Sequence, residues 1–250
     1  MKTSIITLLG CVGMMFAWGT TVFAEDDALM IIRKMDEKQT SDTSKTIMSM
    51  IVYKDADDES TAREMKVLSY GQGADDTYME FLEPRTIKGL RILSKGDERW
   101  AFFPSTGRQR KIAGSAKKES VKGVGGDFSY EDMGGGTFEE KYTPKLLETQ
   151  EAYWIIEGAP KKTNAVYSKV RVAIDKQTYL PHKMEYYTDE DGHYKDMTLE
   201  DFKIISGRET ATKTTMHTLT KNTKTVLLLH EAEYDLPVPD KYFDPNRFSK

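Results

Sequence analysis

The sequence predicts a mainly β protein: a curved antiparallel half-barrel with an N-terminal helix and a helical lid loop covering a hydrophobic cavity. Three observations lead to this prediction. Beyond residue 40, apolar and polar residues alternate in about a dozen short runs, with the period of a strand. Turn residues such as Gly96-Asp97 and Lys221-Asn222 separate nearly all of the runs, which favours tight antiparallel connections. A twisted sheet of so many strands curls, and the few helical segments are then expected to cover its concave side.

The first 24 residues have the pattern of a secretory signal peptide. Lys2 precedes an apolar run from Ile5 to Trp18, and small residues occupy the −3 and −1 positions at Val22 and Ala24. We therefore expect cleavage after Ala24 and export to the periplasm. An uncleaved membrane anchor is the alternative, but Gly10 and Gly13 interrupt the run.

Cys11 raises a second alternative for the same segment. It follows Leu8-Leu9-Gly10, which resembles the lipidation signal of a bacterial lipoprotein, but cleavage there would leave a signal of only ten residues. Because Cys11 is the only cysteine, a chain cut after Ala24 has neither disulfides nor a reactive thiol.

The remaining segment, 25–250, is expected to form a single domain and to act as a monomer. All-β folds often reach this length undivided. Removal of Lys2 with the signal peptide changes the formal net charge from −4 to −5. This mild acidity argues against nucleic acid as a partner, because such proteins present a strongly basic face.

The domain opens with a predicted helix over 26–39. An aspartate can cap its start, and Ala28, Ile31, Ile32 and Met35 follow the i, i+3, i+4, i+7 spacing of an amphipathic helix. The strands that we expect after it span 45–53, 62–70, 76–83, 90–95, 98–103, 108–112, 142–149, 152–158, 165–175, 181–188, 193–205, 209–219 and 224–233.

Two segments interrupt the strands. Residues 113–137 are rich in Gly, Ser and Lys, and a loop of this length is either functional or disordered. Inside it, 127–133 is apolar enough to predict a short helix packed on the sheet, with the flanking glycines as hinges of a lid. The tail, 235–248, contains three prolines, and we expect Tyr242, Phe243 and Phe248 to pin it in a short turn.

The residues that most enzymes use do not form recognisable sets. The four histidines, at 182, 193, 217 and 230, each stand alone on a predicted strand or turn, and none belongs to a metal-binding motif. We therefore expect no enzyme activity, metal or cofactor. Catalytic carboxylates far apart in sequence leave a secreted lipid hydrolase as an open alternative.

Residues 79–133 carry a family pattern. A turn at Pro84 leads through Lys88-Gly89 to a strand, and a strand with Trp100 ends at Pro104. A basic strand follows, and then the motif Asp127-Phe128-Ser129-Tyr130-Glu131-Asp132. The chain thereby resembles the outer-membrane lipoprotein-sorting protein family, a LolA-like branch of the LolA/LolB superfamily.

The resemblance implies a carrier that holds acyl chains in a hydrophobic cavity and moves them between membranes. Burial of an acyl chain requires apolar surface and little other chemistry, since each methylene contributes about 0.8 kcal/mol. We expect the cavity to be lined by Met79, Phe81, Leu90, Ile92, Trp100, Phe102, Trp154 and Ile156. By alternation alone, the same residues are more typical of an ordinary core, and the family resemblance is what favours a cavity.

Two further groups complete the predicted site. The lid motif comprises Asp127, Phe128, Tyr130, Asp132 and Met133. A basic rim that meets lipid phosphate or an acidic docking face comprises Arg108, Arg110, Lys117, Lys118 and Lys122.

The resemblance also implies partners. Members of this branch resemble partners of RND-type inner-membrane transporters, and a carrier makes transient contact with membranes. The expected cargo is a lipid or a lipoprotein acyl chain. Because the branch differs in sequence from the true lipoprotein carrier, the resemblance favours another lipid or hydrophobic substrate. The alternative is an accessory subunit that docks on such a transporter without cargo.

Overall fold

Thirteen strands form one antiparallel sheet in the computed structural model, which describes residues 23–250. The expected signal peptide therefore lies almost wholly outside the described residues. The strands are β1 (Thr43–Tyr53), β2 (Arg63–Gln72), β3 (Asp76–Glu83), β4 (Arg91–Lys95), β5 (Glu98–Phe103), β6 (Arg108–Ile112), β7 (Tyr142–Thr149), β8 (Tyr153–Pro160), β9 (Lys169–Asp175), β10 (Pro181–Thr188), β11 (Gly192–Ile205), β12 (Arg208–Thr218) and β13 (Thr223–Tyr234). Each predicted strand is present, with its ends within a few residues of those expected.

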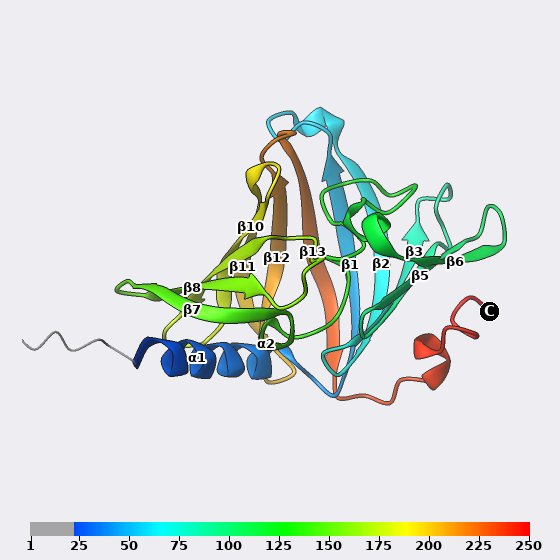
Figure 1. Ribbon diagram of the computed structural model, residues 1–250. Helices are drawn as coiled ribbons and strands as arrows, with labels where there is room; N and C mark the ends of the chain where they lie inside the picture. Colours follow the sequence, from blue (N-terminus) through cyan, green and yellow to red (C-terminus); the bar gives the residue numbers. More distant parts are fainter. Residues whose placement is uncertain (1–22) are drawn as a thin grey trace, which may run out of the picture.

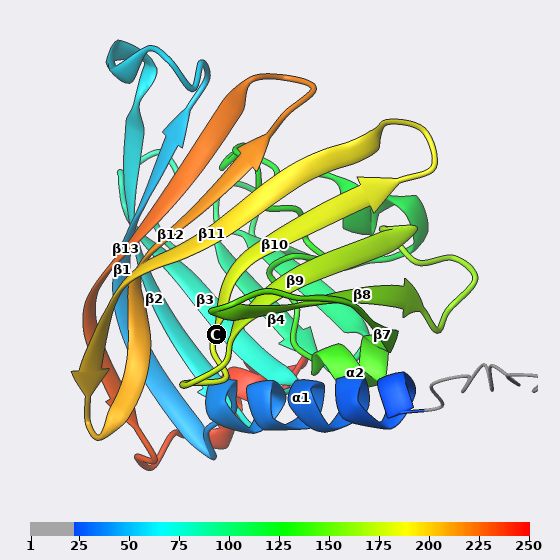
Figure 2. The same cartoon turned by 90° about the vertical axis from the view of Figure 1, so that its left-hand side faces the viewer.

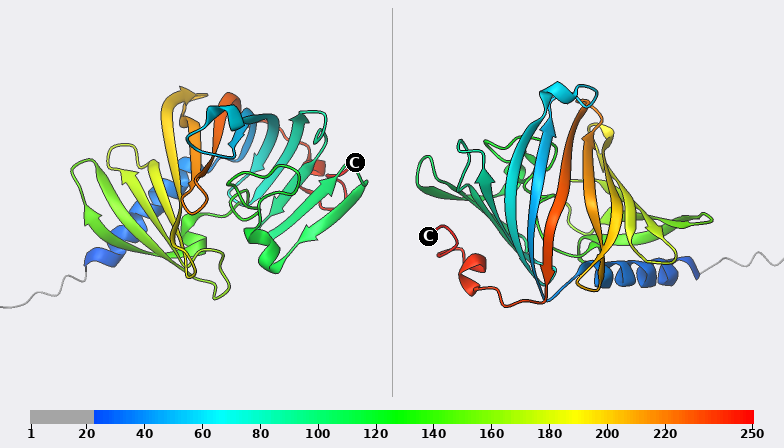
Figure 3. Two further views of the ribbon diagram at one scale, coloured as in Figure 1. Left: turned by 90° about the horizontal axis from the view of Figure 1, so that it is seen from above. Right: turned by 180° about the vertical axis from the view of Figure 1, so that it is seen from behind.

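The sheet consists of two meanders joined at their first and last strands. Its order is β6-β5-β4-β3-β2-β1-β13-β12-β11-β10-β9-β8-β7, so β1 pairs with β13, for example Met50 with Leu227. The strands β6 and β7 form the two edges and do not pair with each other, which leaves the sheet open (Figure 1). Seen from above, the sheet curves into the predicted half-barrel (Figure 3).

The N-terminal helix α1 (Phe23–Gln39) packs against β7 and against the short helix α2 (Phe138–Lys141) along one rim of the half-barrel (Figure 2). The four apolar side chains that predicted its buried stripe, from Ala28 to Met35, are all buried. On its outer side, Arg33 forms an ion pair of 2.9 Å with Glu139 of α2. None of the helices that residues 23–250 form is long and apolar enough to cross a membrane.

The connection between β6 and β7 crosses the concave face, because these consecutive strands lie at opposite edges of the sheet. We call residues 113–137 the crossing loop. Its Val121, Val124, Phe128, Tyr130 and Met133 pack into the core that the concave face of the sheet forms with α1. The crossing loop is thus part of the core of the protein.

The short helix expected over 127–133 is not formed. The crossing loop contains the 3₁₀ helix η2 (Gly114–Lys118), whereas residues 130–133 form turns and Ser129 makes an isolated β-bridge with Ser120. The side chains of Asp127 and Asp132 bond to groups on distant strands, and short polar side chains of this kind compete with helical hydrogen bonding.

A second, smaller apolar cluster lies on the convex face beneath the C-terminal tail. We call it the tail cluster. It consists of buried Tyr78, Leu93, Trp100, Phe243 and Phe248, with Tyr70, Phe102, Val238 and Tyr242 packed against them. The ring of Tyr242 stacks on that of Tyr70 at 4.5 Å, and the 3₁₀ helix η3 (Asp240–Phe243) supplies the expected turn. The aromatic residues of the tail therefore cover an apolar strip of the outer face.

Loss of one anchor should release the tail without unfolding the sheet. Truncation of a buried Phe to Ala costs about 3–5 kcal/mol, and a terminal segment opens locally before the fold does. We expect Phe248→Ala to shift the emission of Trp100 to the red and to expose the tail to protease. Substitution of the exposed Asn246 by Ala is the control. Unchanged emission and protection in Phe248→Ala would contradict this role of the tail.

Candidate functional site

The concave face presents a continuous row of paired side chains, all apolar except that of Thr225. Directly paired residues on successive strands are Leu146, Ile156, Val172, Met184, Met197, Met216, Thr225 and Val52, running from β7 to β1. Three neighbouring strands thus each contribute a methionine, and we call Met184, Met197 and Met216 the methionine row. Methionine side chains are flexible and polarisable, so such a surface can adapt to ligands of varied shape.

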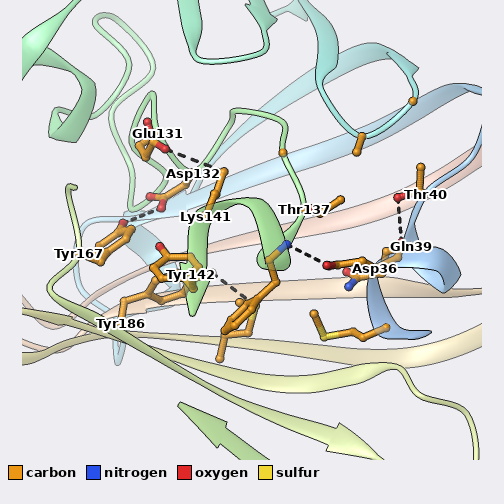
Figure 4. Close-up of a pocket in the computed structure, with 16 residues that line it drawn as sticks. Asp36, Gln39, Thr40, Glu131, Asp132, Thr137, Lys141, Tyr142, Tyr167 and Tyr186 are labelled. Atoms are coloured by element: carbon orange, nitrogen blue, oxygen red, sulfur yellow. Dashed lines mark hydrogen bonds and ion pairs between the residues drawn. The ribbon is translucent and has the colours of Figure 1, made fainter. Parts of the chain in front are cut away.

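A cavity of about 270 Å³ lies beside the methionine row (Figure 4). We call it the helix pocket, because α1 forms one wall, with α2 and the end of the crossing loop opposite. Its apolar lining comprises Met35, Phe138, Tyr142, Tyr167, Met184 and Tyr186, and its polar groups include Asp36, Gln39, Thr40, Thr137 and Lys141. Seven of its sixteen lining residues are charged or polar, so the pocket combines apolar surface with several polar groups. Small-molecule sites likewise use placed polar groups to orient a ligand.

Some polar groups of the helix pocket already form hydrogen bonds within the protein. Both carboxylate oxygens of Asp36 accept backbone N–H groups of α2, from Phe138 and Glu139, at 3.0 Å each. Burial raises the pKa of Asp36, and these two hydrogen bonds oppose that shift. Asp36 therefore serves to fix α2 against α1.

A buried ion pair fastens the crossing loop to the sheet. The Asp132 carboxylate lies 3.2 Å from Lys195 Nζ on β11, and both side chains are only 4% exposed. Asp132 also accepts hydrogen bonds from the hydroxyl of Tyr167 at 2.6 Å and from the backbone N–H and hydroxyl of Ser129 at 2.8 Å. Burial, and then the nearby Asp132 charge, raise the pKa of Tyr167 well above its ordinary value, so this residue stays a donor.

Asp127 provides a second attachment. Its carboxylate accepts hydrogen bonds from Thr223 and Thr225 on β13, and its carbonyl accepts one from Lys195 Nζ at 2.5 Å. Together, Asp127, Asp132, Tyr167 and Lys195 form what we call the latch. Two residues of the predicted lid motif are thus the loop's polar attachments, whereas Phe128, Tyr130 and Met133 are its apolar ones.

The glycines after the motif permit close packing. A Cβ on Gly134 would lie 1.8 Å from a guanidinium nitrogen of Arg99, which is 1% exposed. A Cβ on Gly135 would lie 2.4 Å from the carbonyl oxygen of Asp75. These two positions accommodate neighbouring groups, so the expectation that they act as free hinges is not supported by their surroundings.

A second cavity, of about 570 Å³, lies on the other side of the latch. Its lining is mostly polar, with Asp127, Lys195 and the β10–β11 turn residues Asp189, Glu190 and Asp191 among its walls. Tyr167 lines both cavities. The latch therefore lies between the two cavities.

The predicted cavity residues divide between the two faces of the sheet. Phe81, Leu90, Ile92 and Ile156 are buried in the concave core, and Met79 and Trp154 pack against it. None of the six lines the helix pocket.

The predicted position of Trp100 and Phe102 in the concave cavity is wrong. Both belong to the tail cluster on the convex face, so they do not share a surface with Leu90 and Ile92. Strands β4 and β5 are apolar on both faces because the tail covers the outer one, and alternation alone therefore assigns no inner face.

The predicted basic rim is also divided. Arg108 and Arg110 lie on the edge strand β6, opposite Phe103 and Ala101. Lys117 instead donates to the carbonyl of Asp97, and Lys118 lines the polar cavity. Lys122 is exposed at the start of the turn that contacts Ile87 through Gly123.

Sequence reasoning missed three residues of the site: Arg99, Tyr167 and Lys195. A signal for Lys195 exists, because it lies two residues from Met197 and therefore on the inward face of β11. A lysine at such a position is buried only when it has a partner. Nothing comparable in the sequence marks Arg99 or Tyr167.

The histidine environments offer no catalytic set among the described residues. Ser49 Oγ lies 2.8 Å from His230 Nε2, but its other partner is Glu64, and no carboxylate contacts that histidine. In a Ser-His-acid triad the acid must orient the imidazole.

One set of possible metal ligands, Glu185, His193 and Asp196, already holds a cation from the protein itself. Lys183 Nζ lies 2.9 Å from Glu185 and 3.4 Å from Asp196. A metal ion would have to displace this lysine, so the three residues form a surface ion-pair network.

The latch can be tested by removing one of its charges. Asp132→Ala should lower the free energy of unfolding by about 3–5 kcal/mol, because Lys195 is left buried without its counter-charge. The double variant Asp132→Ala/Lys195→Met should recover most of that loss. Chemical denaturation measures both. A single variant that loses less than about 1 kcal/mol would show that the ion pair does not hold the loop.

Comparison with known proteins agrees with this architecture. A protein-family model described as "Uncharacterized protein" matches residues 73–250, whereas no curated protein matches the chain. A solved domain from Vibrio parahaemolyticus, named for outer membrane lipoprotein sorting, has a TM-score of 0.78 at 22% identity and covers 90% of this chain and 100% of its own. A DUF1329 family protein from Desulfovibrio piger has a TM-score of 0.78 at 22% identity, over 88% of this chain and 97% of its own.

A LolA superfamily protein from Nitrosomonas europaea has a TM-score of 0.73 at 22% identity, over 87% of this chain and 97% of its own. At such identities the similarity demonstrates a shared fold. The predicted LolA-like half-barrel is confirmed. The chain belongs to the family whose model covers residues 73–250, and its fold is that of the LolA superfamily.

Proposed function

We propose that the protein binds the acyl chain of a lipid or lipoprotein on the concave face of the half-barrel and carries it between membranes. The methionine row beside the helix pocket is the observation that carries this proposal. An acyl chain is recognised by apolar surface alone, and a sixteen-carbon chain gains about 12 kcal/mol from complete burial.

A long chain needs more space than the helix pocket offers. Its volume of about 270 Å³ is just below the 300–1,000 Å³ typical of ligand sites. The crossing loop occupies the rest of the concave face with Phe128, Tyr130 and Met133. We infer that loading displaces this loop, so that acyl methylenes replace its apolar side chains while the sheet stays folded.

The filled concave face also favours a second function. A protein whose core is complete without cargo fits an accessory subunit that docks on an RND-type inner-membrane transporter. That partnership follows from the family resemblance. The hydrolase alternative gains no support from the histidine environments of the described residues.

A charge placed in the helix pocket should separate the two functions. Met184 lines the pocket on the inner face of β10, whereas Thr198 pairs with Lys183 on the outer face. We expect the parent to bind a fluorescent fatty acid and Met184→Asp to bind it at least about tenfold more weakly, because the substitution replaces an apolar contact of the methionine row with a carboxylate that acyl methylenes cannot pair. Thr198→Asp, the matched control, should bind as the parent does.

Two results of the same assay would contradict the carrier function or its placement. A folded Met184→Asp variant with parental affinity would show that the acyl chain does not bind in this pocket. No binding by the parent, together with the absence of co-purifying lipid in native mass spectra, would favour the transporter-docking function.

We further propose that the protein is exported to the periplasm as a single domain of residues 25–250. The helix α1 begins at Phe23, next to the expected cleavage site, so cleavage after Ala24 would leave nearly all of this helix intact. The intact mass of protein recovered from the periplasm tests this directly. A chain starting at Glu25 is expected, whereas retained residues 1–24 or an acylated Cys11 would contradict it.

A further inference from the structure

Positive charge is concentrated at the β6 end of the sheet. Residues 84–122 contain eleven Lys and Arg against three Asp and Glu, a net charge of +8. Because the whole chain carries −4, the remainder carries −12. We propose that this end of the half-barrel docks the protein on a membrane surface of anionic phospholipid.

Five of these cations are free to meet an external anion. Arg85, Lys88, Arg108, Arg110 and Lys122 are exposed, and among the side chains described for residues 27–250 no carboxylate forms an ion pair with them. We call these five residues the basic edge. Four of the other six cations form ion pairs, for example Lys95 with Asp76 at 3.0 Å. Of the remaining two, Lys117 donates to the carbonyl of Asp97, and Lys118 lines the polar cavity.

The fold brings the basic edge together from three segments. Arg108 and Arg110 project on the concave side of β6, since they pair with Phe103 and Ala101 of the concave core. The β3–β4 turn, which carries Arg85 and Lys88, adjoins the β5–β6 turn: a Cβ on Gly89 would lie 3.7 Å from Pro104. In the crossing loop, the neighbour of Lys122 contacts the same β3–β4 turn, with a Cβ on Gly123 3.8 Å from Ile87.

Apolar side chains are interspersed with these charges. Ile87, Phe103 and Ile112 pack only partly into the concave core and remain half-exposed among the cations. Such a combination suits a lipid headgroup region, where cations pair with phosphate and apolar groups enter the acyl boundary. Charges on an edge strand also prevent pairing with other strands, but that role does not require the Arg85 and Lys88 turn.

Docking at the basic edge would bring the opening of the half-barrel to the lipid surface. The use of this orientation for lipid transfer rests on the proposed carrier function, whereas the docking itself does not. No residue of the basic edge lines the helix pocket, so the two proposals can be tested separately.

Vesicle co-sedimentation of the complete protein tests the docking. We expect binding to phosphatidylcholine vesicles that contain about a third phosphatidylglycerol, little binding to pure phosphatidylcholine, and loss of binding in concentrated salt. Arg108→Glu/Arg110→Glu should weaken binding to the anionic vesicles at least about tenfold. The control Lys145→Glu/Lys203→Glu changes the net charge equally on exposed residues of β7 and β11, and it should bind nearly as the parent does.

Three results would contradict the docking surface. Equal binding to neutral and anionic vesicles, an equal loss in the control, or no binding to anionic vesicles in dilute salt would overturn the docking surface and leave an acidic protein as the better partner for these cations. The fatty-acid assay on the unmodified protein distinguishes the proposals. Vesicle binding without fatty-acid binding supports docking and rejects the carrier, and the converse rejects docking alone.

Discussion

The organisation of this protein depends on one constraint of connectivity: the two edge strands of the sheet, β6 and β7, are consecutive in the chain. The segment that joins them must therefore cross the open side of the half-barrel. A loop in such a place would bury unsatisfied backbone groups unless it supplied its own partners. The crossing loop meets this requirement with the apolar contacts of Phe128 and Met133 and with the hydrogen bonds of Asp127 and Asp132. The helix pocket and the polar cavity are the spaces that remain on either side of it.

The polar character of the latch suits the proposed displacement of the crossing loop during loading. A buried ion pair is often no more stabilising than an apolar replacement of the same size, but it is strict about geometry. Asp132 has partners on β11, at Tyr167 and within its own turn, so the loop is held in one register. Lys195, Thr223 and Thr225 hold the loop through their side chains, whereas the strand ladder is formed by backbone groups, so its hydrogen bonds can survive when the loop leaves. The proposed carrier function would need this separation between a permanent sheet and a displaceable loop.

Much of the fold could be predicted from sequence because its strands are short, alternating and separated by strong turn signals; the predicted limits of β3, 76–83, coincide with those observed. The helix α1 was equally readable from the spacing of its buried side chains. The face assignment of Trp100 could not be predicted, since the tail that covers it lies some 140 residues away. The predicted helix over 127–133 was wrong for a related reason: Asp127 bonds to Thr225, a partner that local periodicity cannot indicate. An apolar lining could be predicted in general terms from the alternating strands. The latch could not, because its residues come together only through contacts between segments that are distant in sequence.

The methionine row also gives the concave face a chemical sensitivity. Thioethers are oxidised to sulfoxides, which converts a flexible apolar side chain into a polar one. Met216 is fully buried, whereas Met184 and Met197 are half-buried and so are the first of the three that an oxidant would reach. The hydroxyl of Tyr186 lies 3.6 Å and 3.9 Å from their sulfur atoms and would become a hydrogen-bond donor to the new oxygens. Oxidation would therefore make the apolar concave face polar and hydrated without changing the backbone pairing of the strands.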